Sequence, residues 1–183
     1  MADKKSFWED AGRSGLIMGI IPIVYMLISM LVAKIPGENA MLAILAGVLG
    51  MLLWAAKFAF CIYMFKVCLK SYSAGNPEAG HDDVFKFGAA TAFLSALIYA
   101  AFYLAFVLFI QPDVFTTAIE TLKENPMMDA NSLAMLENMI PKMPSISFFT
   151  QLIYCSIWGI VLSAIFSRNI PSDNPFSDDS KNN

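Results

Sequence analysis

Apolar residues dominate four stretches of the chain, which shorter polar segments separate. The stretches cover residues 15–33, 40–66, 84–110 and 148–167. An α-helix needs roughly 20 apolar residues to cross the hydrocarbon core of a bilayer. A backbone in lipid must satisfy its own hydrogen bonds, which favours helices over open strands. The pattern therefore predicts an all-α, polytopic membrane protein built as a four-helix bundle.

The polar segments set the predicted boundaries. Residues 1–14 are interpreted as a charged N-terminal segment, either with Trp8 as an anchor in the headgroup zone or as a short ordered lead into the first helix. Spans one to three occupy residues 15–110, with a tight connection at 34–39. A turn-rich polar loop is predicted over residues 71–83. After span four, at 148–167, residues 168–183 are predicted to form a flexible tail.

Residues 111–147 form the longest segment between two spans. Apolar residues recur at helical spacing within 114–122 and again within 133–140. The spacing predicts two short amphipathic helices, and Asp129 or Ser132 can cap the second. Both are too short to span a bilayer, so we expect them on the membrane surface or packed over the bundle.

Charge is scarce and unevenly placed. Of the 183 residues, 57% are hydrophobic and 15% charged, against about 25% charged in soluble domains. The net charge of −3 gives no basic excess for nucleic acid. Four spans put both termini on one side, and that side carries most of the Lys and Arg: Lys4, Lys5, Arg13, Lys66, Lys70, Lys86, Arg168 and Lys181, against Lys34, Lys123 and Lys142. The positive-inside rule then predicts cytoplasmic termini and an extracytoplasmic 111–147 segment.

Two residues inside the spans are candidates for function. Lys57 is the charge within span two, and an ionisable group within a span is a functional hypothesis by default. The alternative is that its long side chain snorkels to the nearby interface. Pro22 lies inside span one and is predicted to kink it, either for function or as an ordinary membrane-helix proline.

Small residues repeat every four positions in three spans. Span one has Gly15 and Gly19, whereas spans three and four hold longer series: Gly88, Ala92, Ala96 and Ala100, then Cys155, Gly159, Ser163 and Ser167. This spacing places small side chains on one helical stripe, which lets two helices approach closely. We favour packing among the four helices, and a homo-oligomeric face is the alternative.

No segment has the features of a catalytic or metal centre. His81, Asp82 and Asp83 are adjacent but lack a second His or a suitable Cys, and aspartates at a helix start are explained by capping and the helix dipole. Methionines in 127–143 are read as packing residues rather than soft-metal ligands. No nucleophile–base pair, phosphate loop or zinc motif is present. We therefore expect no enzymatic activity, no metal and no cofactor.

The second half of the chain resembles a known family. The residues that carry the resemblance are HDDVFKFGAATAFLSALIYAAFYLAFVLFIQPDVF, the Met-rich amphipathic stretch, and IYCSIWGIVLSAIFSRNIPSDNPF. They are similar to domain of unknown function 4199, a family of small bacterial membrane proteins with four spans and a longer outer loop. The resemblance implies a bacterial cytoplasmic (inner) membrane location and supplies no catalytic or binding motif.

Two functions are compatible with these observations. The first is a non-enzymatic membrane protein that acts by packing with itself or with another membrane protein. The second is a small-solute channel or transporter that acts as an oligomer. The small-residue stripes favour the first, and Lys57 with Pro22 favours the second.

Overall fold

Four long helices make up most of the computed structural model, which describes residues 4–33, 40–123 and 129–169. These are α1 (Lys4–Ala33), α2 (Ala40–Gly75), α3 (His81–Ala105) and α6 (Met143–Ser167). The structure has four helices long and apolar enough to cross a membrane, and its described residues include no strand. The predicted all-α polytopic bundle is confirmed.

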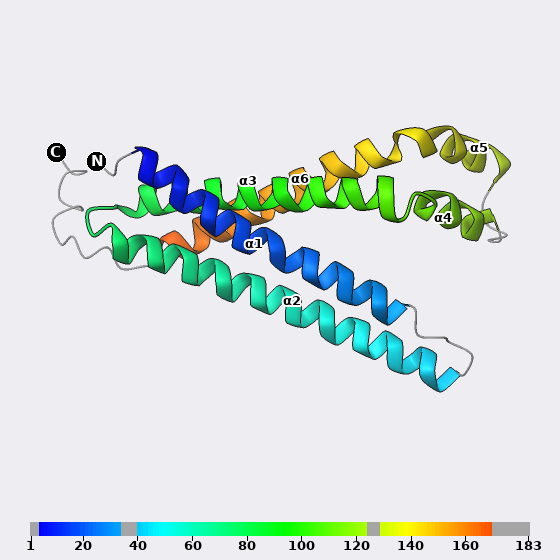
Figure 1. The fold of residues 1–183 in the computed structure, drawn as a ribbon, viewed down its shortest axis with the longest axis horizontal. Helices are drawn as coiled ribbons and strands as arrows, with labels where there is room; N and C mark the ends of the chain where they lie inside the picture. The colour runs from blue at the N-terminus through cyan, green and yellow to red at the C-terminus, as the bar shows by residue number, and fades with distance from the viewer. Residues whose placement is uncertain (1–3, 34–39, 124–128, 170–183) are drawn as a thin grey trace.

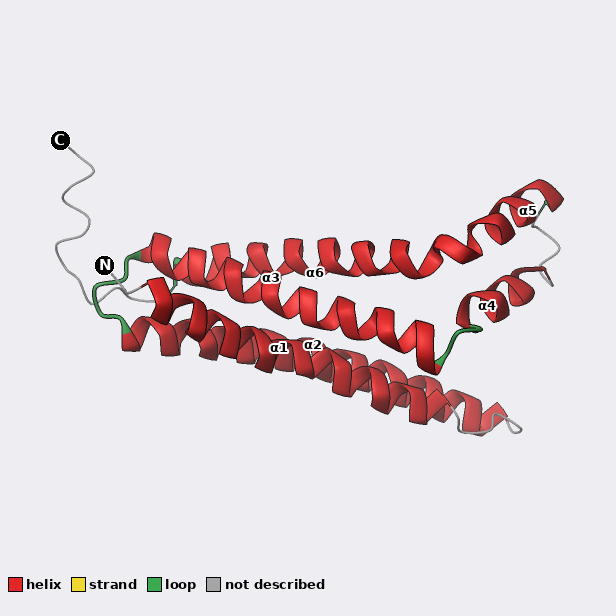
Figure 2. Cartoon of the chain, turned by 45° about the horizontal axis from the view of Figure 1, so that its top comes forward, coloured by secondary structure: helices red, strands yellow, loops and turns green. Residues whose placement is uncertain are grey.

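Helix α3 is the centre of the arrangement. It packs against α1 on one side and α6 on the other, whereas α2 packs mainly against α1. The α1–α2 pair and the α3–α6 pair lie close together where α1 begins and α6 ends, and they diverge toward the other end (Figures 1 and 2). We call the end where the two pairs meet the closed end, and it also holds residues 76–80. We call the end where they diverge the open end, and it holds the last turns of α1 and the first turns of α2.

The first helix begins earlier than the sequence indicated. Residues 4–14, which precede the predicted first span, form the first turns of α1. The reason is tertiary packing, since Ala11 is fully buried and the Phe7 ring lies edge-on to Tyr72 and Phe87. The helix also continues through Pro22 without a break. The predicted 34–39 connection lies outside the described residues.

The polar loop after α2 is shorter than predicted. Helix α2 runs to Gly75, so the loop narrows from 71–83 to residues 76–80. A side-chain hydrogen bond from Asn76 to the Tyr72 carbonyl (3.0 Å) helps to close the last turn. The residue that caps α3 is Gly80, and neither Asp82 nor Asp83 does so, which corrects the predicted capping. Both aspartates lie in the first helical turn, where their charge suits the dipole.

The outer segment contains the two predicted short helices, α4 (Val114–Lys123) and α5 (Ala130–Met139). Asp129 caps α5 by accepting a hydrogen bond of 2.8 Å from the Ser132 amide, as predicted. The two helices pack against each other beyond the ends of α3 and α6 (Figure 2), and an ion pair joins Lys123 to Glu137. The predicted alternative in which they pack over the bundle is therefore wrong.

Two irregular turns join the outer segment to the spans. A π-helical turn, η1 (Phe106–Ile110), follows α3, and a 3₁₀ turn, η2 (Ile140–Lys142), precedes α6. Helix α6 begins at Met143 rather than at residue 148, with Pro144 in its first turn. A proline fits there because the first amides of a helix have no partner within it. The sequence analysis had read this proline as part of the loop.

The hydrophobic core lies at the closed end. Partly buried side chains of α6, Leu162 and Phe166, pack against it. Its fully or nearly fully buried side chains come from α1, α2 and α3: Ala11, Met18, Phe65, Leu69, Tyr72, Val84, Phe87 and Ala92. The rings of Tyr72 and Phe87 are stacked with centroids 3.9 Å apart. At the open end, by contrast, α2 exposes large apolar side chains such as Met41 and Met51.

Candidate functional site

The small residues of spans three and four face each other across the α3–α6 contact. A Cβ atom added to Gly159 would lie 2.2 Å from the Cβ of Ala92, and one added to Gly88 would lie 2.1 Å from the Ser163 hydroxyl. The Ser163 hydroxyl donates a hydrogen bond of 2.9 Å to the Phe85 carbonyl. Close approach and an interhelical hydrogen bond therefore hold α3 to α6, as is usual where lipid removes the hydrophobic force between helices.

The small residues of span one also lie at a contact within the chain. A Cβ atom on Gly15 would lie 2.8 Å from the Leu94 Cβ, and one on Gly19 would lie 3.0 Å from the Ile98 side chain. Further along α3, Ala96 is almost fully buried. The stripes on α1, α3 and α6 are thus occupied inside one chain and are not available to a second copy.

Two glycines of α2 have a different environment. A Cβ atom added to Gly47 or to Gly50 would meet nothing within 4 Å. The sequence analysis did not single out these residues, although the Ala43/Gly47 and Ala46/Gly50 spacing repeats the small-residue pattern of the other spans. We call Ala46, Gly47 and Gly50 the α2 glycine face.

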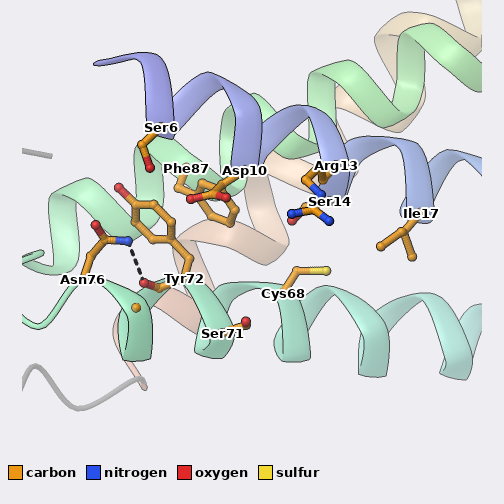
Figure 3. A pocket seen from close by; sticks show the side chains of 11 residues that line it. Ser6, Asp10, Arg13, Ser14, Ile17, Cys68, Ser71, Tyr72, Asn76 and Phe87 are labelled. Atoms are coloured by element: carbon orange, nitrogen blue, oxygen red, sulfur yellow. Dashed lines mark hydrogen bonds between the residues drawn. The ribbon is translucent and has the colours of Figure 1, made fainter. Parts of the chain in front are cut away.

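Lys57 of α2 points toward α1. Its ammonium nitrogen lies over the Tyr25 ring, 4.6 Å from the ring centroid, and the side chain is half-buried. The antiparallel α1–α2 pairing that sets Ser14 beside Cys68 (Figure 3) also brings Tyr25 to the level of Lys57. The Lys57 ammonium therefore has an aromatic face of α1 as a partner within the bundle, an arrangement that stabilises a cation.

Other polar side chains gather near Lys57. Cys61 of α2 and Cys155 of α6 lie near enough to the Lys57 ammonium for its charge to act on their thiol groups. Tyr99 of α3 lies similarly near Cys155 and Tyr25. We call Tyr25, Lys57, Cys61, Tyr99 and Cys155 the Lys57 cluster. It draws on all four spanning helices and contains no carboxylate.

Pro22 borders the Lys57 cluster. It precedes Tyr25 by three residues, so the two share a face of α1. A proline at this position cannot donate to the Met18 carbonyl, which leaves that acceptor without its helical partner. The two in-span candidates of the sequence, Lys57 and Pro22, are thus brought to one region of the bundle.

His81 links the start of α3 to the end of α6 at the closed end. Its Nδ1 atom lies 2.8 Å from the Ser167 carbonyl oxygen, so the ring caps the last turn of α6 from the start of α3. This role joins positions 81 and 167 and is invisible in the sequence. Among the described residues, no group of three or more His, Cys, Asp or Glu side chains is placed to hold a metal ion.

A polar cleft opens between α1 and α2 at the closed end (Figure 3). It has a volume of about 440 Å³. Its charged groups are Asp10 and Arg13 of α1, and the other lining residues are Ser6, Ser14, Ile17, Cys68, Ser71, Tyr72, Gly75, Asn76 and Phe87. This site could not be inferred from the sequence, because its two walls are 51 or more residues apart in the chain and no motif marks either wall.

One comparison with known proteins identifies a family. The family described as "Protein of unknown function (DUF4199)" matches residues 13–168. The chain belongs to the DUF4199 family. The match covers all four spanning helices of this DUF4199 member, apart from the first turns of α1, and confirms the resemblance found in the sequence. No curated protein and no solved structure matches the chain.

Proposed function

We propose that this DUF4199 member is a non-enzymatic protein of the bacterial cytoplasmic membrane that acts through helix–helix association. The partner surface is the α2 glycine face, and the partner is a second copy of the chain. Association through small residues needs close backbone approach, which only an unoccupied glycine or alanine surface permits.

The observation that carries the proposal is the contrast among the glycines. Gly15, Gly19, Gly88 and Gly159 each have another helix where a Cβ would be, at 3.0 Å or less. Gly47 and Gly50 have open space. Glycine costs helix stability relative to alanine, by about 1 kcal/mol. Two glycines in an exposed helix segment are therefore better explained by a neighbour that lies outside the chain.

A crosslinking experiment in membranes tests the proposal. The native cysteines Cys61, Cys68 and Cys155 are replaced by Ala or Ser, and a single cysteine is placed at Ala46. Oxidation is expected to yield a crosslinked dimer. A Gly50→Leu substitution in the same background is expected to abolish the crosslink, because the added side chain separates the two backbones.

Gly12→Leu provides the matched control. A Cβ at Gly12 also meets nothing within 4 Å, but Gly12 lies at the closed end, far along α1 from the α2 glycine face. This variant is expected to crosslink like the parent. Absence of a dimer in the parent, or a dimer that survives Gly50→Leu, contradicts the proposal. A crosslink to another membrane protein in place of the dimer would keep the surface and change the partner.

The orientation belongs to the same proposal, with both termini in the cytoplasm and α4 and α5 outside. The support is the positive-inside count together with the His81–Ser167 contact, which sets the start of α3 beside the end of α6. A cysteine at Ser132 is expected to react with an impermeant thiol reagent added outside intact cells, and a cysteine at Glu78 is not. The opposite labelling would invert the topology.

The Lys57 cluster favours a second candidate, a channel or transporter for a small solute that acts as an oligomer. A charge held among phenols and thiols within the spans is typical of substrate and ion pathways. Lys57→Leu is expected to abolish transport with normal membrane insertion if this candidate holds. Lys57→Arg keeps the charge and serves as its control.

A further inference from the structure

The polar cleft at the closed end lies where two helices change from polar to apolar. Arg13 is the last charged residue of α1 before its apolar run. On α2, Lys66 and Lys70 lie at a similar level and their side chains are exposed. Charged residues collect at the membrane interface, so the cleft opens at the boundary between headgroups and hydrocarbon.

The polarity of the cleft changes along its length. Asp10 lies one helical turn farther from the apolar run than Arg13, with Tyr72 opposite it on α2 (Figure 3). Ser71 lies between the levels of Asp10 and Arg13, and Ser14 and Cys68 lie beside Arg13 (Figure 3). Ile17 forms the innermost edge. From water toward lipid, the cleft therefore presents an acid, then a base with hydroxyl groups beside it, and then an apolar edge.

A zwitterionic phospholipid carries its groups in the same order. Its amine is outermost, its phosphate comes next, then the glycerol esters and the acyl chains. Arginine is suited to a phosphate because its planar guanidinium donates two parallel hydrogen bonds. Asp10 and Arg13 form no salt bridge with each other or with any other side chain that the structure describes, so both charges remain available.

We infer that the cleft binds the headgroup of a phospholipid that carries a primary ammonium group. Arg13 binds the phosphate, with hydroxyl groups of Ser14 and Ser71 beside it. Asp10 accepts hydrogen bonds from the ammonium, and the acyl chains leave past Ile17 into the bilayer. The volume of about 440 Å³ falls within the range of small-molecule sites.

The aromatic residues of the cleft argue for a primary rather than a quaternary amine. Quaternary ammonium groups are recognised by the faces of aromatic rings. Here the Tyr72 and Phe87 rings are stacked on each other, and Phe7 lies edge-on to both. A primary ammonium instead donates three hydrogen bonds, which suit a carboxylate and neighbouring hydroxyl groups.

Native mass spectrometry of the purified full-length chain in detergent tests the inference. The probes are phosphatidylethanolamine, phosphatidylcholine and phosphatidylglycerol with identical acyl chains. Phosphatidylethanolamine is expected to bind about tenfold more tightly than the other two, which corresponds to one charge-assisted hydrogen bond. Equal binding of all three lipids, or of phosphatidylcholine and phosphatidylethanolamine, overturns the inference.

Two variants separate the roles of the charges. Asp10→Asn is expected to remove the preference for phosphatidylethanolamine over phosphatidylglycerol. Arg13→Gln is expected to weaken the binding of all three lipids by about tenfold. Glu9→Gln and Lys70→Gln are the matched controls, since both residues are exposed near the cleft but do not line it. Unchanged binding in both test variants, with the helical circular dichroism of the parent, overturns the inference.

Soluble competitors distinguish a lipid site from a site for a free anion. Phosphoethanolamine is expected to displace the lipid only at high concentration, because it lacks the acyl chains, and inorganic phosphate is expected to displace none. Displacement by inorganic phosphate as effectively as by phosphoethanolamine overturns the inference. The α2 glycine face lies at the opposite end of α2, so these variants leave the proposed association untouched.

Discussion

The closed and open ends of the bundle follow different packing rules. At the closed end, four helices bury a core that includes Leu69 and Phe87, as a soluble bundle does. At the open end the helices diverge and leave large apolar side chains exposed, among them Met41 and Phe109, each 83% exposed. Spans of similar hydropathy therefore pack differently at the two ends of the bundle.

The two ends of the bundle are surrounded by different solvents. Water forces apolar groups together, whereas lipid removes that force and leaves close packing and hydrogen bonds to join helices. The closed end carries the charged residues Asp10, Arg13, Asp82 and Asp83. Water therefore reaches the surface around its buried core. Helix α2 has 36 residues and is longer than a ~30 Å hydrocarbon core requires, which lets its last turns emerge on the closed side.

The largest loss of stability is expected from a substitution in the core of the closed end. Phe87→Ala removes a ring that is 1% exposed and is expected to lower the free energy of unfolding by about 3–5 kcal/mol. Phe109→Ala removes the same ring from a position that is 83% exposed and is expected to change little. Thermal unfolding in one detergent compares the two variants. Equal losses would show that the ends do not differ.

The next effect tests the contact that joins α3 to α6. Gly159→Leu is expected to cost about 1–3 kcal/mol, because its Cβ would lie 2.2 Å from that of Ala92 and the helices must separate. Gly12→Leu, made in open space on α1, is the control and is expected to leave the unfolding temperature unchanged. Resistance to limited proteolysis provides an independent readout. A stable Gly159→Leu variant would mean that the two helices are free to move apart.

A smaller effect concerns the hydrogen bonds within the spans. Ser163→Ala removes the bond to the Phe85 carbonyl and is expected to cost about 0.5–1 kcal/mol. The buried Ser156 hydroxyl has no partner among the described residues, so Ser156→Ala is expected to be neutral or slightly stabilising. Denaturant unfolding measures both. A larger loss in Ser156→Ala would reveal a partner for that hydroxyl.

The smallest effect concerns the outer segment beyond the open end. The hydrogen bonds from Ser132 hold the pKa of Asp129 below its ordinary value. The cap therefore stabilises α5 at neutral pH and loses its effect as the pH falls through that lowered pKa. Protection of the Ser132 and Leu133 amides, measured as exchange relative to the unstructured rate at the same pH, is expected to fall in acid. Asp129→Ala should show low protection at every pH, and protection equal to that of the parent at neutral pH would show that the cap contributes nothing.

The sequence predicted what depends on composition and on local spacing. Four spans, the α4 and α5 helices and the Asp129 cap all follow from apolar runs or from residues within one turn. The extension of α1 to Lys4 was missed because it depends on tertiary contacts. Phe7 packs against Tyr72 of α2 and Phe87 of α3, and Ala11 is buried in the same core. The Gly80 cap was missed because an aspartate is favourable both as a cap and within the first helical turn. Asp82 and Asp83 lie in that first turn, and Gly80 precedes it.

The sites show the same limit. Lys57 and Pro22 stood out because a charge and a proline are rare in an apolar run. The Tyr25 ring beneath Lys57 could not be inferred, since it depends on how α1 and α2 pair. The polar cleft needs the same pairing, because Asp10 and Tyr72 become neighbours only across two helices. Spacing within one helix is visible in a sequence, and register between helices is not.

The π-helical turn at Phe106–Ile110 sets the direction in which the chain leaves α3 toward α4. The Gln111 amide donates to the Phe106 carbonyl (3.0 Å), so this wide turn accommodates one residue more than an α-helical turn. Deleting one residue there would restore the ordinary ladder and rotate the start of α4 by about 100° about the axis of α3. Lys123 would then leave the side on which it meets Glu137. The third span therefore cannot change length by a single residue without turning the outer segment to face a new direction.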